Sequence, residues 1–273
     1  MLNNCIILLL SFFLFSCDEP ELPGYKYSLY EDTPVYELAL AIKDDDSSWV
    51  NSILKDTTID VNYQETKFGK SLLEVAIVNQ KKKAFLSLLE NGANPNLRGL
   101  DVGHSIISTP FITSCMSGGA KPFFCNTYYM EQLLIYGADP NSYEIRITPD
   151  GLSHQINALL IAISKKSEVG DDCIEPIRLL IKSGADIDEC TDIEGYGAIT
   201  KSLILDRLKI AKYLIVNQKA TILDTVYIRR KGTPEEHALS ISDLLLEEDY
   251  INEPGKRRSK LEILNYLDSI GKK

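Results

Sequence analysis

A stretch that recurs along the chain limits its fold more than any other feature. The clear copies read LLENGANPN at 88–96, LLIYGADPN at 133–141 and LLIKSGADID at 179–188, and a degenerate copy, ILKDTTIDVN, occupies 53–62. The glycines of the clear copies, Gly92, Gly137 and Gly184, lie 45 and 47 residues apart. A repeat of this length predicts stacked structural units rather than one globular core.

Each copy has the residues that end one helix and begin an extended loop. The leucine pair packs one face of a helix, and the glycine adopts a left-handed conformation without the cost of a Cβ atom. The Asn and Asp residues that follow favour side-chain turns. A second short apolar helix is predicted before each copy, at 71–79, 109–115, 157–164 and 197–205. One such unit cannot bury its apolar faces alone, so the units must stack.

The units resemble the ankyrin repeat family, whose unit of about 33 residues reads Gly-x-Thr-Pro-Leu-His-x-Ala and ends in Gly-Ala-Asp-x-Asn. The matching positions are Gly69, Ser71–Ala76 and Gly92–Asn96 in the second unit, Thr109–Phe111 and Gly137–Asn141 in the third, and Ala162 and Gly184–Asp188 in the fourth. The resemblance covers residues 34–273. It implies an all-α repeat solenoid of about five to six repeats, with helix-turn-helix units and β-hairpin fingers.

Some of the expected repeats are degenerate. The fifth lacks its glycine, and Gln218, which follows Gly184 by 34 residues, stands at the expected place. Residues 263–271 predict a terminal cap. The histidine of the family motif is missing from every copy and is replaced by Glu74, Ile112, Leu160 and Thr200. We therefore expect fewer hydrogen bonds between neighbouring units and a larger contribution from packing.

Long insertions fall in two kinds of place. They separate paired helices at 116–126, 165–172 and 249–259. They also extend two fingers: 142–157 predicts a hairpin with its turn at Thr148–Gly151, and 225–241 predicts another around Lys231–Pro234. Long insertions in a solenoid usually map to one face, often the binding face.

The N-terminus has the pattern of a signal peptide. Ile6–Phe15 is an uninterrupted apolar run, too short for a bilayer, which needs about 20 residues, but the length of a signal-peptide core. Leu14–Cys17 resembles a bacterial lipobox, although the first four residues lack Lys or Arg and Phe15 is bulky. The resemblance implies cleavage between Ser16 and Cys17 and a lipid on the Cys17 thiol. The expected organisation is a signal peptide at 1–16, a tether at 17–33 and the repeat domain at 34–273.

Charge and motif content exclude several functions. The formal net charge of −10 argues against a nucleic-acid partner, which needs a basic face. His104, His154 and His237 are isolated, and no phosphate loop, metal-binding spacing or nucleophile motif occurs. We expect no enzyme activity and no cofactor.

Four cysteines remain beyond the lipobox. A Cys115–Cys125 disulfide would clamp the insertion between them, and a Cys125–Cys173 bridge is the alternative, with Cys190 unpaired. Four buried free thiols are equally compatible with the sequence.

The expected function is the binding of a protein by a monomer anchored in the bacterial cell envelope through Cys17. The outer membrane, on its periplasmic or surface side, and the inner membrane are both open. Family resemblance places the contact surface on the finger tips and the exposed side of each first helix, here Lys70, Asn79, Arg98, Tyr143, Arg146, Tyr196 and Arg229.

A specific hypothesis is an immunity protein that neutralises a toxin acting in the envelope. It is motivated by the tether, the acidic charge and the degenerate repeats. The alternatives are an envelope assembly or scaffold factor and, if the lipobox is not used, an intracellular ankyrin adaptor.

Overall fold

The computed structural model describes residues 22–103, 106–116, 126–165, 173–190, 196–223, 225, 227–229, 237–246 and 253–272, with only the backbone at 228 and 229. Its α-helices are α1 (Tyr36–Lys43), α2 (Ser47–Ile53), α3 (Leu72–Val78), α4 (Lys82–Glu90), α5 (Pro110–Met116), α6 (Tyr128–Ile135), α7 (Ala158–Ser164), α8 (Glu175–Lys182), α9 (Ala198–Ile204), α10 (Leu208–Lys212), α11 (Ile241–Leu246) and α12 (Pro254–Ser269). Its strands are β1 (Ile106–Ile107), β2 (Tyr143–Ile147), β3 (Ser153–Asn157), β4 (Tyr227–Arg229) and β5 (His237–Leu239).

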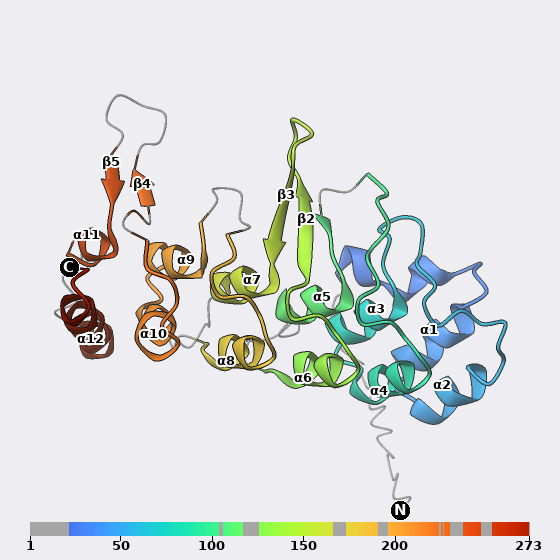
Figure 1. The fold of residues 1–273 in the computed structure, drawn as a ribbon. Coiled ribbons are helices and arrows are strands. Elements are labelled where there is room, and N and C mark those ends of the chain that lie inside the picture. The colour runs from blue at the N-terminus through green and yellow to red at the C-terminus, as the bar shows by residue number, and fades with distance from the viewer. Residues whose placement is uncertain are drawn as a thin grey trace, which may run out of the picture.

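The helices form two rows, with the strands projecting from one side (Figure 1). Odd-numbered helices form the inner row, in which each contacts the next from α1 to α11. Even-numbered helices form the outer row, and α1/α2 through α9/α10 pack as pairs. We number the units by these pairs. The predicted solenoid architecture is therefore confirmed over the described residues.

Apolar patterning explains the two rows. All seven residues of α3 are buried, because this helix packs between α1, α4 and α5. In the outer row α8 buries only Ile177 and Leu180 and exposes its polar face. A helix buried on all sides lies inside, and an amphipathic helix covers it.

The predicted glycines end the outer helices as expected. Gly92, Gly137 and Gly184 have φ of 88°, 87° and 97°, which glycine adopts without steric cost. The next residue turns the chain back, as when the Ala93 amide donates to the Leu88 carbonyl at 2.9 Å. These positions set the start of each finger.

In the fifth unit the left-handed residue is Lys219, with φ of 55°, and not Gln218 as the spacing predicted. The reason is a π-helical turn, η3 (Tyr213–Asn217), which follows α10 and accommodates one extra residue. As a result the Ala220 amide reaches back to the Leu214 carbonyl, at 3.0 Å, and the turn closes one residue later.

We expect Lys219→Gly to raise the free energy of unfolding by about 0.5–1 kcal/mol, because lysine is disfavoured in the left-handed region and glycine is not. Thermal unfolding monitored by circular dichroism measures the change. Lys209→Gly, within α10, should destabilise by about the cost of glycine in a helix, roughly 1 kcal/mol. A loss of stability in both variants would contradict the proposed strain at Lys219.

The extended fingers are hairpins. Strand β2 pairs antiparallel with β3, and β1 adds a third strand on the other edge of β2. The turn lies at Thr148–Leu152, with Gly151 at φ of 84° and its amide donating to the Thr148 carbonyl at 2.8 Å. Strands β4 and β5 form the second predicted hairpin, whose turn lies outside the described residues.

The tether predicted for 17–33 is wrong over its second half. Residues 22–33 pack onto the solenoid through the 3₁₀ turns η1 (Pro23–Tyr25) and η2 (Tyr27–Tyr30). Tyr27 and Tyr30 are buried, η1 contacts α3 and η2 contacts α1. The folded domain therefore includes residues 22–33 and does not begin at residue 34. No helix in the described part of the chain is long and apolar enough to cross a bilayer.

Hydrogen bonds between units are more numerous than the missing histidines predicted. A side chain at the end of each finger motif accepts from a backbone amide of the next unit: Asn62 from Asn94 at 2.8 Å, Asn96 from Asp139 at 2.9 Å, Asn141 from Asp186 at 2.8 Å, and Asp188 from Thr221 at 2.9 Å. We call these four contacts the finger ladder. It ties each of the first five units to its neighbour.

Glu74, at the histidine position of the second unit, supplies a second connection. Its Oε2 accepts from the Ser71 amide at 3.1 Å and completes a capping box that starts α3. Its Oε1 accepts from Lys70 Nζ, Ser108 Oγ and Thr113 Oγ1, each at 3.1 Å. The last two belong to the third unit, so the expectation of few hydrogen bonds between units is wrong here.

Candidate protein-binding surface

The fingers of the second and third units bring two of the predicted contact residues together. Arg98 and Tyr143 are 45 residues apart, yet the Arg98 guanidinium carbon lies 4.4 Å from the centre of the Tyr143 ring. A cation over an aromatic face at this distance is attracted by the ring quadrupole. Both side chains are half-buried, so each keeps a solvent-facing edge.

The backbone beneath this pair is held firmly. Gln64 Nε2, from the preceding finger, donates to the Arg98 carbonyl at 2.8 Å and to the Gly69 carbonyl at 3.3 Å. Arg98 Nη1 approaches the Tyr143 carbonyl at 3.5 Å. An arginine and a tyrosine held in place lose little side-chain entropy when a partner binds, which favours them as binding anchors.

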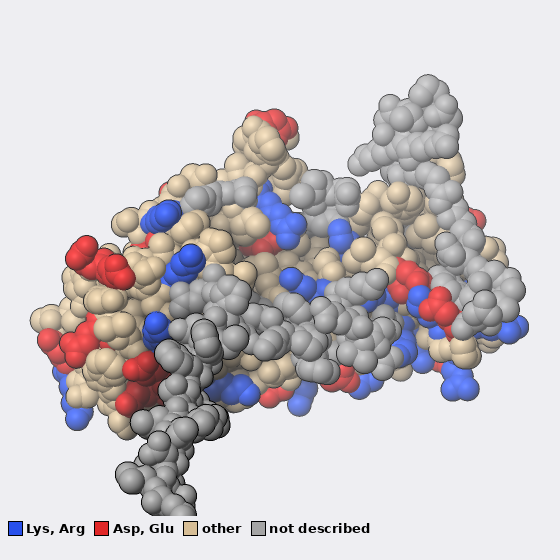
Figure 2. Space-filling model, turned by 180° about the vertical axis from the view of Figure 1, so that it is seen from behind, with Lys and Arg blue, Asp and Glu red and all other residues tan. Residues whose placement is uncertain are grey.

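Arg146 lies on the opposite face of the hairpin. Strand side chains alternate between faces, and the register pairs Tyr143 with Asn157 but Arg146 with His154. Figure 2, from behind, shows basic side chains at the base of this hairpin and acidic ones at its tip. The predicted surface is thus divided between two faces.

A buried carboxylate accompanies Arg146. Glu144 is fully buried, and its Oε1 accepts from Arg146 Nε at 2.5 Å. The Oε2 atom of Glu144 has no hydrogen-bond partner among the described residues. Burial lowers the pKa of the nearby Lys165, Glu144 raises it and Arg146 lowers it, with a net decrease. Glu144, Arg146 and Lys165 together provide two basic groups and one acidic group.

Two other predicted residues lie near the fifth unit. The ring of Tyr196 is 5.4 Å from that of Tyr227, at an angle of 48°. Both are half-buried. Arg229 has its backbone in β4, paired with His237, and its side chain lies outside the described atoms.

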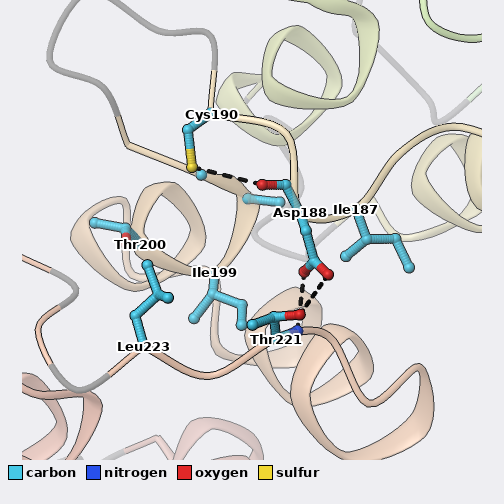
Figure 3. Close-up of a pocket in the computed structure, with 9 residues that line it drawn as sticks. Ile187, Asp188, Cys190, Ile199, Thr200, Thr221 and Leu223 are labelled. Carbon is cyan, nitrogen blue, oxygen red and sulfur yellow. Dashed lines mark hydrogen bonds between the residues drawn. The ribbon is translucent and has the colours of Figure 1, made fainter.

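A small pocket of about 120 Å³ lies beside the start of α9. It is lined by Ile187, Asp188, Cys190, Gly197, Ala198, Ile199, Thr200, Thr221 and Leu223 (Figure 3). Gly197, the N-cap of α9, offers no side-chain hydrogen bond at this position, whereas Asn157 caps α7 by accepting from the Leu160 amide at 2.9 Å. A Cβ at Gly197 would lie 3.0 Å from Cys190 Sγ. Leu223 is 56% exposed at this site.

The side chains of Lys70 and Asn79 make contacts within the fold. Lys70 is buried, and its Nζ bonds Glu74 at 3.1 Å and Ser108 at 2.9 Å. Burial lowers the pKa of Lys70, but Glu74 and Tyr25 together raise it above its ordinary value, so the ammonium is charged at neutral pH. The Asn79 side-chain amide donates to the Tyr25 carbonyl at 2.9 Å. The prediction missed these roles because the N-terminal segment covers both residues.

Exposed apolar residues on the fingers were not predicted. They are Leu100, Ile106, Leu152 and Leu223, between 43% and 58% exposed. Each falls in a finger loop or strand, and alternation along the hairpin could have indicated Leu152.

The cysteines differ from the predicted pairing. Cys115 has a free, buried thiol, so the Cys115–Cys125 bridge is wrong, because Cys115 lies within α5 with its side chain in the core. Burial raises the pKa of this thiol to about 12. Cys173 is disulfide-bonded, and its partner lies outside the described residues. Cys190 is an exposed thiol.

We expect iodoacetamide to alkylate Cys190 in the folded protein and to leave Cys115 unmodified, because only the exposed thiol forms an accessible thiolate. Cys173 should become reactive only after reduction. Peptide mass mapping before and after unfolding measures all three. Modification of Cys115 without denaturant would contradict its burial.

Metal-ligand clusters and histidines add no further site in the described part. No three His, Cys, Asp or Glu side chains there are grouped to hold a metal ion. His154 lies in β3 and His237 in β5, while His104, like Ser16, Cys17 and Cys125, falls outside the described residues.

Comparison with known proteins supports the fold. No protein-family model matches this chain, and no curated protein shows significant sequence similarity to it. The chain is similar to a solved structure described as the crystal structure of EF0377, an ankyrin repeat protein. The sequences are 22% identical, the alignment covers 86% of this chain and 97% of the other, and the TM-score is 0.55. The fold is that of an ankyrin-repeat solenoid.

Proposed function

We propose that this ankyrin-repeat chain is a monomeric, non-catalytic scaffold that binds a protein through its fingers. The observation that carries the proposal is the Arg98–Tyr143 pair, a cation–aromatic contact at 4.4 Å on a firmly held backbone. Exposed Leu100 and Ile106 lie in the neighbouring loop and strand. Arginine and tyrosine beside apolar side chains have the composition of an interface hot spot.

The expected result of Arg98→Ala or Tyr143→Ala is a partner affinity lower by about tenfold or more, equal to about 1.4 kcal/mol, with the fold retained. The partner is first identified by cross-linking in intact cells, and its affinity for each purified variant is then measured by calorimetry. Arg178→Ala is a matched control, because Arg178 stacks on Tyr213 at 5.4 Å in the outer row of helices. Equal losses in finger and control variants would contradict the proposed surface.

A second part of the proposal is the lipid anchor. The apolar run before Leu14, the small Ser16 and the nucleophilic Cys17 support processing as a lipoprotein, with cleavage between the last two residues. A chain with two or three acyl groups is held stably on a membrane, which one chain does not achieve. Cys17→Ala should move the protein from the membrane fraction to the soluble fraction, and intact mass should show the missing acyl groups. If the Cys17→Ala protein stayed in the membrane fraction, the lipid anchor would be refuted. An uncleaved signal peptide that holds the chain in the membrane would then be the alternative.

The finer functional proposal is immunity to a toxin that acts in the envelope. An anchored, acidic scaffold with divergent repeats suits the neutralisation of one dedicated partner. The prediction is that a strain without this protein is killed by a toxin encoded beside its gene, and that an Arg98→Ala, Tyr143→Ala chain restores protection only weakly. Normal growth of the deletion strain when it is exposed to that toxin would exclude this role. Many cross-linked partners would then favour an assembly or scaffold factor in the envelope.

A further inference from the structure

We propose that the face of the solenoid around Leu22 and Phe68 lies against an anionic phospholipid surface, so that the membrane is a second partner of the folded domain. The inference rests on the lipid anchor proposed above. It concerns a face different from that of the Arg98–Tyr143 pair.

The linker between the anchored Cys17 and the folded domain is short. Residues 22–33 are part of the fold, so only five peptide units separate Cys17 from Leu22. Even fully extended, five residues span about 18 Å. The Leu22 Cα must therefore lie within about 18 Å of the Cys17 Cα, which keeps it close to the membrane that holds the anchor.

The segment that follows this linker is fixed to the solenoid by hydrogen bonds and by burial of its tyrosines. The Tyr25 carbonyl accepts from Asn79 Nδ2 at 2.9 Å, and the Tyr30 hydroxyl donates to the Lys70 carbonyl at 2.8 Å. Tyr27 and Tyr30 are 4% and 0% exposed. The distance limit on Leu22 thus applies to the first units of the solenoid as a rigid body.

The side chains at this place suit a lipid interface. Leu22 is 50% exposed, and Gly24 packs against the Phe68 ring, with an ideal Cβ only 3.6 Å from Phe68 Cγ. Phe68 is half-buried and therefore keeps part of its ring in solvent. An aliphatic and an aromatic side chain beside an acyl anchor can enter the boundary between headgroups and acyl chains.

Two lysines lie in the same segments as these apolar side chains. Lys26 and Lys67 are exposed beside this apolar pair, and Lys67 Nζ lies 5.5 Å from the centre of the Phe68 ring. Lysine side chains near an anionic lipid surface are attracted by its negative potential. Asp18, Glu19 and Glu21 lie in the linker itself and oppose this attraction, so the contact depends on Leu22 and Phe68 as well as on the lysines.

A single-tryptophan experiment tests the contact. Trp49→Phe removes the only native tryptophan, and Phe68→Trp places a probe on the proposed face. The full chain, processed and acylated in cells, is reconstituted into vesicles of phosphatidylglycerol and brominated phosphatidylcholine. We expect the bromine atoms to reduce the emission of the Phe68→Trp probe strongly, and Lys26→Glu with Lys67→Glu to restore most of it. Leu22→Trp serves as a second probe if the first variant does not fold.

Leu261→Trp is the matched control, because Leu261 is 51% exposed on α12 at the far end of the solenoid. Its emission should be unchanged by the brominated lipid. Intact mass separates the two possible failures. A mass without acyl groups overturns the anchor and this inference together, whereas an acylated chain whose Leu22 and Phe68 probes keep full emission overturns this inference alone.

Discussion

Glu74→Ala is expected to lower the free energy of unfolding by about 3–5 kcal/mol, the usual cost of breaking a buried ion pair by removing one partner. The carboxylate is fully buried and forms a salt bridge with Lys70 at 3.1 Å, whose side chain is only 11% exposed. Its removal leaves an ammonium in a site without a counter-charge. The hydroxyls of Ser108 and Thr113 lose their shared acceptor at the same time.

The only tryptophan makes the measurement local. Trp49 lies in α2, where its Nε1 donates to Glu37 Oε1 at 3.3 Å, and its fluorescence reports unfolding of the first units. Urea unfolding followed by this signal gives the free energy for the region around Glu74. Because neighbouring units stabilise one another in a solenoid, circular dichroism on the same samples shows whether the rest of the chain unfolds in the same transition.

Two controls separate charge from shape at Glu74. Glu74→Gln keeps the acceptor oxygen and loses the charge, so its cost should fall between those of wild type and Glu74→Ala. Glu90→Ala removes an exposed carboxylate from α4 and should change stability by less than about 0.5 kcal/mol. A similar small effect at Glu74 would contradict its role in joining the second and third units.

Tyr30→Ala is expected to cost about 3–5 kcal/mol, as for other large aromatic side chains removed from a core. Tyr30 is 0% exposed and its ring centre lies 6.4 Å from that of Tyr63. Tyr30→Phe keeps the ring and removes only the hydrogen bond to the Lys70 carbonyl, so it should cost about 1 kcal/mol. The same urea experiment measures both variants.

This prediction decides where the folded domain begins. If residues 17–33 were a tether, neither substitution would change stability. Leu22→Ala, at a side chain that is 50% exposed, is the control in the same segment and should remain within about 0.5 kcal/mol of wild type. If Tyr30→Ala, Tyr30→Phe and Leu22→Ala all had the stability of wild type, the folded domain would begin at residue 34 as the sequence predicted.

Local chemistry explains what could be predicted from the sequence. Gly92, Gly137 and Gly184 mark helix ends because a left-handed residue is needed there and glycine adopts it at least cost. The hairpin turn at Thr148–Gly151 is local in the same sense. Lys219 escaped prediction because a π-helical turn shifted the helix end by one residue, and no fixed spacing anticipates such a shift.

Features that could not be predicted from the sequence depend on contacts between distant residues. Glu74 meets Ser108 and Thr113, which are 34 and 39 residues away, so its role depends on how two units stack. The N-terminal segment has no apolar periodicity, and its tyrosines pack one by one into places that only the assembled helices create.

The candidate surface has one feature that follows from local sequence and one that depends on contacts between units. Tyr143 and Arg146 point to opposite faces because they are three residues apart on one strand, which follows from the predicted hairpin alone. That Arg98 lies over Tyr143 requires the stacking of two fingers and appears only in the structure.

The position of the finger ladder has an evolutionary consequence. Its bonds, from Asn62–Asn94 to Asp188–Thr221, hold the units at the ends of the outer helices, whereas two of the long insertions, 116–126 and 165–172, come at the ends of α5 and α7. Genetic gains or losses in those connections leave the bonds that set the stacking register untouched. Such a chain can change the lengths of these connections over generations without altering the stacking of its units.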